Sequence, residues 1–196
     1  MDKFRYIETY LKETSQITDR IDVNIIMKMV DILLEIKKNG GRLFFLGVGG
    51  GAGNASHATN DFNKIAKIST ICLSDNVSLV TALTNDEGWE SVFSRQLEIH
   101  KLNSKDCLFI YSVGGGTETT SKNLVLAIDF AKKVGAKILG VVGKETGATA
   151  KIADACLIIP KIEESRITPH TEDFQIVINH LLVNLIYEIE KYEERK

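Results

Sequence analysis

The chain has 196 residues, of which 44% are hydrophobic and only two are proline. This length and composition suit one globular domain with a substantial core and argue against intrinsic disorder. The formal net charge is -2 at pH 7, so the overall charge gives no reason to expect a nucleic-acid or membrane-surface partner.

Hydrophobic periodicity predicts two helices ahead of the first strand. Apolar side chains recur at helical spacing between Val23 and Leu34, and Asn39-Gly40-Gly41 is a typical helix end. Strand-like runs then alternate with helical patterns, which predicts right-handed crossovers and a parallel sheet. The strands are expected at 43–46, 68–73, 107–112, 138–142 and 156–160, and the helices between them at 53–66, 76–83, 88–101, 119–134 and 146–153.

The last helix is predicted to run from Thr168-Pro169 to about Glu193. Its apolar residues lie on several sides, which is not typical of a helix that faces solvent on one side. They are Ile176, Val177, Ile178, Leu181, Leu182, Val183, Leu185, Ile186 and Ile189. Burial from two directions predicts an oligomer interface; the alternative is a central core helix of a monomer.

A glycine-rich turn follows the first predicted strand. Residues 47–53 contain five glycines, and the helix after them carries His57 and Asp61. Such a turn lets a phosphate approach bare backbone N–H groups, and a helix N-terminus adds positive potential. Residues four apart lie on one helix face, so the imidazole and the carboxylate are expected to point the same way. This combination is what a sugar-phosphate enzyme requires.

A second turn of the same kind spans Ser112–Ser121, with three glycines followed by several hydroxyl residues. Hydroxyls and N–H groups at a helix start suit a phosphate monoester, and the alternative is a hydroxyl-rich N-cap. In an open parallel sheet, ligands bind outside the carboxyl ends of the strands. The two turns are therefore expected to face one crevice, with the reacting carbons near the first turn and the phosphate near the second.

Two other phosphate-binding motifs are excluded or weak. No Gly-Lys-Ser/Thr follows the glycines, so the Walker A motif is absent. Gly47-x-Gly49-x-x-Ala52 loosely matches a dinucleotide motif, but an acidic residue should follow about 20 positions on. The nearest candidate, Asp75, is 28 positions beyond Gly47. The sequence therefore argues against a nicotinamide cofactor.

Glu172 and His180 form a second candidate pair on the last helix. Eight helical steps leave them about 80° apart and two turns along, so both reach one site if the cleft wraps this helix. A histidine within an apolar helix needs a polar partner. His57 and Asp61 remain open as a metal pair, an acid/base pair or surface residues. His100 and His170 are expected to be surface or capping residues.

The termini and cysteines bear on location. The N-terminus lacks the apolar segment of a signal peptide, and no apolar run approaches the roughly 18 residues of a transmembrane helix. Cys72, Cys107 and Cys156 each lie in an apolar, strand-like segment. This pattern predicts buried free thiols and a cytoplasmic protein, without a cysteine metal cluster.

With these motifs, the chain resembles the phosphoheptose isomerase family of sugar isomerase (SIS) domains. The resemblance covers nearly the whole chain and is carried by residues 47–62, 85–96, 112–121 and 172–180. The family converts sedoheptulose 7-phosphate to glycero-manno-heptose 7-phosphate, a precursor for cell-surface polysaccharides such as lipopolysaccharide or capsule. It implies one SIS domain over residues 1–196: a flavodoxin-like, three-layer α/β/α fold with a five-stranded parallel sheet. Residues 1–41 would be helices used in oligomer packing, and the assembly a homotetramer.

The resemblance also implies a metal site formed by His57, Asp61, Glu172 and His180. The family has Glu and Gln where this chain has Asp61 and Glu172. Two ionised carboxylates give the ligand set a charge of -2, which neutralises a divalent ion, and two histidines with two carboxylates suit Zn²⁺. Isomerisation needs a base for the proton α to a carbonyl and a group to stabilise the enediolate. Asp61 is predicted as the base and His180 as the acid, with Glu172 as the alternative base.

The substrate contacts implied by the resemblance lie in both turns and in the Asn85-Asp86 segment. They are Gly49, Gly50, Gly51, Asn54, Asp86, Ser112, Gly114, Thr117, Thr119, Thr120 and Ser121. Both turns depart from the family's usual Gly-Asn-Gly-Gly-Ser and Ser-Thr-Ser-Gly-Asn-Ser, with Val48, Gly51, Val113 and Gly114 at changed positions. Two alternatives therefore remain open: an isomerase of another sugar phosphate, or a non-catalytic sugar-phosphate sensor or adaptor.

Overall fold

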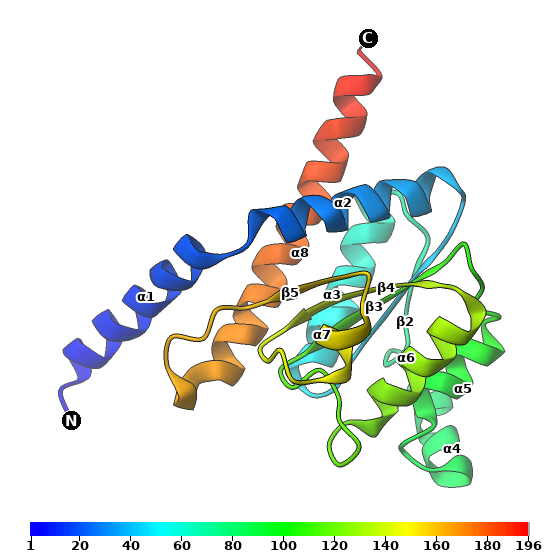
Figure 1. Cartoon of the computed structure of the whole chain (residues 1–196), viewed down its shortest axis with the longest axis horizontal. Helices are drawn as coiled ribbons and strands as arrows, with labels where there is room; N and C mark the ends of the chain where they lie inside the picture. Colours follow the sequence, from blue (N-terminus) through cyan, green and yellow to red (C-terminus); the bar gives the residue numbers. More distant parts are fainter. Residues whose placement is uncertain (196) are drawn as a thin grey trace.

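Five parallel strands form one sheet, in the order β2-β1-β3-β4-β5, in the computed structural model, which describes residues 1–195 (Figure 1). The strands are β1 (Leu43–Gly47), β2 (Thr70–Cys72), β3 (Cys107–Ser112), β4 (Lys137–Val142) and β5 (Ala155–Ile158). Strands β1, β3 and β4 are apolar and almost wholly buried, as expected for strands covered on both faces. The predicted parallel sheet is confirmed.

Helices cover both faces of this sheet and make the predicted three layers. They are α1 (Lys3–Arg20), α2 (Val23–Lys38), α3 (Gly50–Lys64), α4 (Val77–Glu87), α5 (Val92–Ile99), α6 (Lys122–Val134), α7 (Ala148–Ile152) and α8 (Ile167–Glu193), with a 3₁₀ turn at Glu164–Arg166. Apolar residues of α2, α3 and α8 pack on one face, and those of α4, α5, α6 and α7 pack on the other. Helix α1 and the end of α8 extend beyond the sheet (Figure 1).

Helix α3 begins earlier than predicted, at Gly50 instead of residue 53. Gly49 supplies the sharp entry, with φ of 62°. A Cβ atom on Gly51 would lie 2.6 Å from the carbonyl oxygen of Tyr111, so this glycine lets the helix pack closely against β3. Close packing therefore outweighs the low helix propensity of glycine. Helices α5 and α6 are shorter than predicted, and Ser121 before α6 has φ of 54°.

The strand order changes direction at β1. Strand β2 lies on one side of β1 and β3 lies on the other. Because β1 and β3 are parallel neighbours, the turns that follow them lie at the same end of the sheet. This is the carboxyl end of the strands, where open α/β sheets bind ligands. This arrangement agrees with the expected crevice between the two glycine-rich turns.

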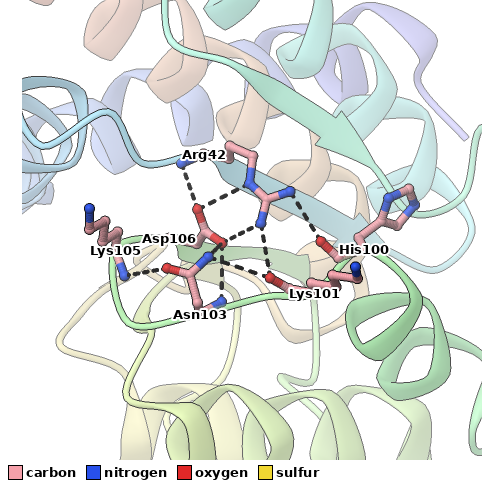
Figure 2. Close-up of polar contacts among 6 residues, drawn as sticks. All are labelled: Arg42, His100, Lys101, Asn103, Lys105 and Asp106. Carbon is pink, nitrogen blue, oxygen red and sulfur yellow. Dashed lines mark hydrogen bonds and ion pairs between the residues drawn. The ribbon is translucent and has the colours of Figure 1, made fainter.

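An ion pair between Arg42 and the buried Asp106 lies at the opposite end of the sheet, where β1 and β3 begin (Figure 2). Asp106 accepts hydrogen bonds from the Arg42 backbone N–H and from its Nε and Nη2 atoms, the last at 2.7 Å. It also accepts from the backbone and side-chain amides of Asn103. Arg42 donates further to the carbonyl oxygens of His100 and Lys101. The cluster therefore ties the end of α5 to the starts of both strands.

Helix α1 is held to α8 by a second buried polar cluster. Glu13 accepts from Arg166 Nε at 2.7 Å and pairs with His170 Nε2 at 3.0 Å. His170 is 3% exposed, so its predicted surface or capping role is wrong: a carboxylate of α1, distant in sequence, covers it. The Arg166 hydrogen bond, supported by His170 and opposed by burial, lowers the pKa of Glu13 to about 2.

This cluster predicts an acid-sensitive contribution to stability. Because the pKa of Glu13 is about 2 in the fold against an ordinary 4.5, its stabilisation is present above 4.5 and is lost as the pH falls toward 2. We expect Glu13→Gln to lower the melting temperature at neutral pH, and the gap to wild type to shrink through this acid range. Thermal melts across pH measure the gap, and Glu8→Gln, at an exposed position of α1, is the control. A gap that stays constant down to pH 2 would contradict this assignment.

Within residues 1–195 no helix is long and apolar enough to cross a membrane. Cys72, Cys107 and Cys156 are free thiols, as predicted. Cys72 and Cys107 are buried and Cys156 is half-buried, and burial raises the pKa of all three thiols. The thiols are therefore protonated at neutral pH and poor nucleophiles.

Candidate metal centre and active site

Three predicted site residues converge between α3 and α8. His57 and Asp61 lie one turn apart on α3, and His180 approaches from α8. Asp61 Oδ2 lies 3.0 Å from His57 Nε2 and 3.4 Å from His180 Nε2, and the two Nε2 atoms are 3.1 Å apart. The structure therefore brings together one carboxylate oxygen and two imidazole nitrogens from separate helices.

The spacing of these atoms fits a divalent metal ion. Zn–N and Zn–O bonds of about 2.0–2.1 Å in a tetrahedral site place neighbouring ligand atoms about 3.3 Å apart. The three separations here span 3.0–3.4 Å. Both imidazoles are about half exposed, 49% for His57 and 51% for His180. Three protein ligands with a solvent-facing side are typical of a catalytic zinc site, which keeps a position for water or substrate.

Asp61 is the buried member of this triad, with 6% of the residue exposed. Asn60 Nδ2 donates to its Oδ1 at 3.1 Å, and Asn179 Nδ2 donates to its Oδ2 at 2.7 Å. The hydroxyl of Tyr111 is buried nearby, and burial, with a smaller effect from the Asp61 charge, raises the pKa of Tyr111. Neither asparagine was predicted, because a lone asparagine in a helix gives no pattern.

Glu172 lies outside the triad, although it was predicted as a fourth ligand. Its carboxylate lies against Gly50 at the start of α3, where a Cβ atom would come within 2.4 Å of it. Asn54, whose predicted contact with substrate stays a prediction, donates to the Glu172 carbonyl at 2.8 Å and to Gln175 Oε1 at 2.9 Å. Glu172 therefore faces the first glycine-rich turn, and the amide of Asn54 holds α3 against α8.

The second turn is ordered by its own hydroxyls. Ser112 Oγ accepts from the Gly115 N–H at 3.0 Å, and Thr117 Oγ1 accepts from the Thr120 N–H at 3.0 Å. Thr149, from α7, donates to the Gly115 carbonyl at 2.8 Å. These bonds fix the backbone of the turn.

The exposed end of this turn leads into α6. The Thr119 hydroxyl lies 3.4 Å from that of Thr117, and within residues 1–195 the Ser121 side chain makes no capping hydrogen bond to α6. Gly114 has open space beside its Cα, and Gly49 does so in the first turn. Neither of these two glycines is therefore crowded by the fold, and ligand binding at the two turns stays a prediction.

Asp86 is the predicted contact that the structure does not bring to the triad. It lies near the end of α4, accepts from Asn85 Nδ2 at 2.8 Å and is exposed. Helix α4 packs on the sheet face opposite to α3 and α8. Within one chain, Asp86 and the triad therefore occupy opposite faces of the sheet.

Comparison with known proteins agrees with the fold. The SIS domain family matches residues 5–143, which defines the class of the protein. The phosphoheptose isomerase of Helicobacter pylori (strain P12) is 32% identical over 167 residues, covering 83% of this chain and 82% of the relative. That of a Nitratiruptor species is 35% identical over 162 residues, covering 80% and 82%. The chain therefore belongs to the phosphoheptose isomerase family of SIS-domain proteins.

A solved structure supports the same architecture. The phosphoheptose isomerase from Francisella tularensis superposes with a TM-score of 0.83 over 96% of this chain and 100% of that chain, at 22% sequence identity. At this identity the likeness concerns the fold, and the flavodoxin-like, five-stranded arrangement is thus confirmed.

Proposed function

We propose that this protein is a metal-dependent aldose–ketose isomerase that converts sedoheptulose 7-phosphate to D-glycero-D-manno-heptose 7-phosphate. Membership of the phosphoheptose isomerase family supports the substrate. The observation that carries the proposal is the convergence of His57, Asp61 and His180, whose ligand atoms all lie within 4.8 Å of one another. Such a centre suits a reaction in which negative charge develops on a sugar oxygen.

The chain's own groups supply the proton transfers. A carboxylate removes the proton α to the substrate carbonyl and returns it to the adjacent carbon, and an imidazole exchanges a proton with the substrate oxygen. We assign these roles to Asp61 and His180, with Glu172 as the alternative base. His57, Asp61 and His180 would hold the Zn²⁺, and Glu172 as its fourth ligand stays a prediction. When bound, the metal supplies electrostatic stabilisation for the enediolate charge.

We place the substrate phosphate at the second turn. The backbone from Gly114 to Ser121 and the start of α6, which the Ser121 side chain does not cap, offer N–H donors and positive helix potential to an anion. The hydroxyls of Thr117, Thr119, Thr120 and Ser121 stand beside these donors. The first turn, Gly49 to Gly51, then lies toward the reacting carbons, where Glu172 meets Gly50.

We further propose a homo-oligomer, a tetramer by family resemblance, acting in the cytoplasm. One side of α8 is buried in the core, whereas Val177, Leu181 and Leu185 on its other side are 51%, 40% and 40% exposed. His180 lies on this exposed side, so a subunit packed there would border the triad. Helix α1 adds exposed Phe4, 70%, and Leu11, 64%. Light scattering tests the proposal, and a monomer would contradict it.

The experiment that tests the function is a turnover assay with sedoheptulose 7-phosphate. Purified protein is stripped with a chelator and assayed with and without added Zn²⁺. We expect the aldose phosphate to form only when the metal is restored. A stripped protein that turns over at the full rate would contradict the metal centre. A metal-loaded protein that binds the ketose phosphate without converting it would favour another sugar phosphate or a sensor, because both glycine-rich turns differ from the usual family pattern.

A further inference from the structure

The two oxygens of the Asp61 carboxylate have different surroundings. Oδ1 accepts from Asn60, whose side chain is at an exposed position. Oδ2 is the oxygen shared by the His57 and His180 imidazoles, and it also accepts the short bond from Asn179. Asn179 therefore donates to the same carboxylate oxygen, Asp61 Oδ2, that lies next to both imidazole nitrogens.

The donor at Oδ2 carries no charge. A buried carboxylate needs hydrogen bonds or a counter-ion, because its removal from water is costly. Among residues 1–195, the only basic side chains within ion-pair distance of Asp61 are the imidazoles of His57 and His180. An amide orients the carboxylate without neutralising it, whereas a lysine or arginine would cancel the charge that attracts a cation.

The Asn179 amide is paired through its nitrogen, which donates to Asp61, and, in the described part of the chain, unpaired through its oxygen. The residue is 0% exposed, and within residues 1–195 its Oδ1 is a buried acceptor without a hydrogen-bond partner. A buried unpaired acceptor destabilises a fold, and leucine, with the same number of side-chain heavy atoms, would avoid that cost. The bond to Asp61 also sets the orientation of the amide, because a reversed amide would point an oxygen at a carboxylate.

Helix geometry lets Asn179 and His180 reach the same carboxylate from two sides. Successive residues on a helix point about 100° apart. Asn179 therefore points into the core under α8, and His180 stands at the exposed rim with about half of its side chain accessible. Asp61 is held between the two.

We propose that Asn179 is a positioning residue of the metal centre, which fixes Asp61 Oδ2 at the point where the two imidazole nitrogens converge. The inference rests on the metal centre of the proposed function, and it does not depend on which sugar phosphate is the substrate. Outer hydrogen bonds of this kind set the direction of a ligand, and their loss typically lowers metal affinity about 10- to 100-fold.

The test compares Asn179→Leu with Asn184→Ala. Asn184 lies on the same helix and donates to the His180 carbonyl, away from the triad, so it is a matched control. Zn²⁺ affinity is measured on the full chain by competition with a chromophoric chelator, with the rise in melting temperature on Zn²⁺ addition as a second readout. We expect Asn179→Leu to bind Zn²⁺ roughly 10- to 100-fold more weakly. The metal-free melting temperature should fall as well, because the buried Asp61 carboxylate loses a hydrogen bond, and Asn184→Ala should match wild type in Zn²⁺ affinity.

Each outcome decides the proposal. If Asn179→Leu does not fold, Asn179→Ala removes the same donor with less added bulk and takes its place. Weakened Zn²⁺ binding by a variant that is folded at the assay temperature supports the positioning role, even if sedoheptulose 7-phosphate is not converted. Wild-type affinity in the variant overturns it. A wild-type protein that binds no Zn²⁺ overturns it together with the metal centre, and the turnover assay on that same protein then reports separately on the isomerase.

Discussion

Replacing Asp61 with asparagine should lower kcat for sedoheptulose 7-phosphate by roughly 10³-fold, because the substitution removes the proposed base and a charged metal ligand together. This loss corresponds to about 4 kcal/mol of transition-state stabilisation. The variant should stay folded, since asparagine keeps the shape of the side chain and removes a buried charge. Steady-state kinetics and a thermal melt measure the two effects.

The control for this variant is Asp129→Asn, at an exposed position of α6. Its kcat should equal that of wild type within about twofold, as expected for an exposed site without special contacts. An Asp61→Asn protein that keeps more than about a tenth of the wild-type kcat would remove Asp61 from the chemistry.

Glu172→Gln separates the two candidate bases. Glu172 lies against Gly50 at the first turn and outside the triad. With Asp61 as the base, Glu172→Gln should lower kcat far less than Asp61→Asn does. If Glu172→Gln instead causes the larger loss, the base is Glu172 and Asp61 serves mainly as a metal ligand.

Most of the fold is predictable from the sequence because its strands are short, strongly apolar and separated by helical patterns. The predicted strand 107–112 coincides with β3, Cys107–Ser112. The start of α3 was predicted three residues late, because glycine is a poor helix former in isolation. The close approach of Gly51 to the Tyr111 carbonyl requires a glycine in this helix, and sequence periodicity carries no information on that approach.

The site is predictable where residues share a helix face and unpredictable where they meet across the fold. His57 and Asp61 lie one turn apart, so their proximity follows from helix geometry. Glu172 lies two turns from His180, about 12 Å along the helix, and no local pattern predicts that its carboxylate lies against Gly50 at the start of α3. The Asn179–Asp61 and Glu13–His170 contacts join segments that are distant in sequence, and no local sequence pattern predicts them.

The largest stability effect is expected at the other end of the sheet, from Asp106→Ala. Asp106 is 2% exposed at its side chain and receives donors from Arg42 and Asn103, including both of their backbone N–H groups (Figure 2). Removing the carboxylate leaves the two backbone N–H groups without this acceptor and leaves a partly buried guanidinium without its counter-ion. Breaking such a buried pair costs about 3–5 kcal/mol, which in a domain of this size lowers the melting temperature by roughly 10 °C.

Asp154→Ala is the matched control, because Asp154 also bonds a backbone N–H at the start of a strand. It accepts from Ile138 N–H at 2.9 Å and lies 3.3 Å from Lys137 Nζ, but its side chain is 36% exposed. Water replaces the lost partner there, so the cost should be about 1 kcal/mol or less. The difference between the two variants therefore isolates the effect of burial. Equal losses in the two proteins would show that the backbone bond, and not the buried charge pair, dominates at Asp106.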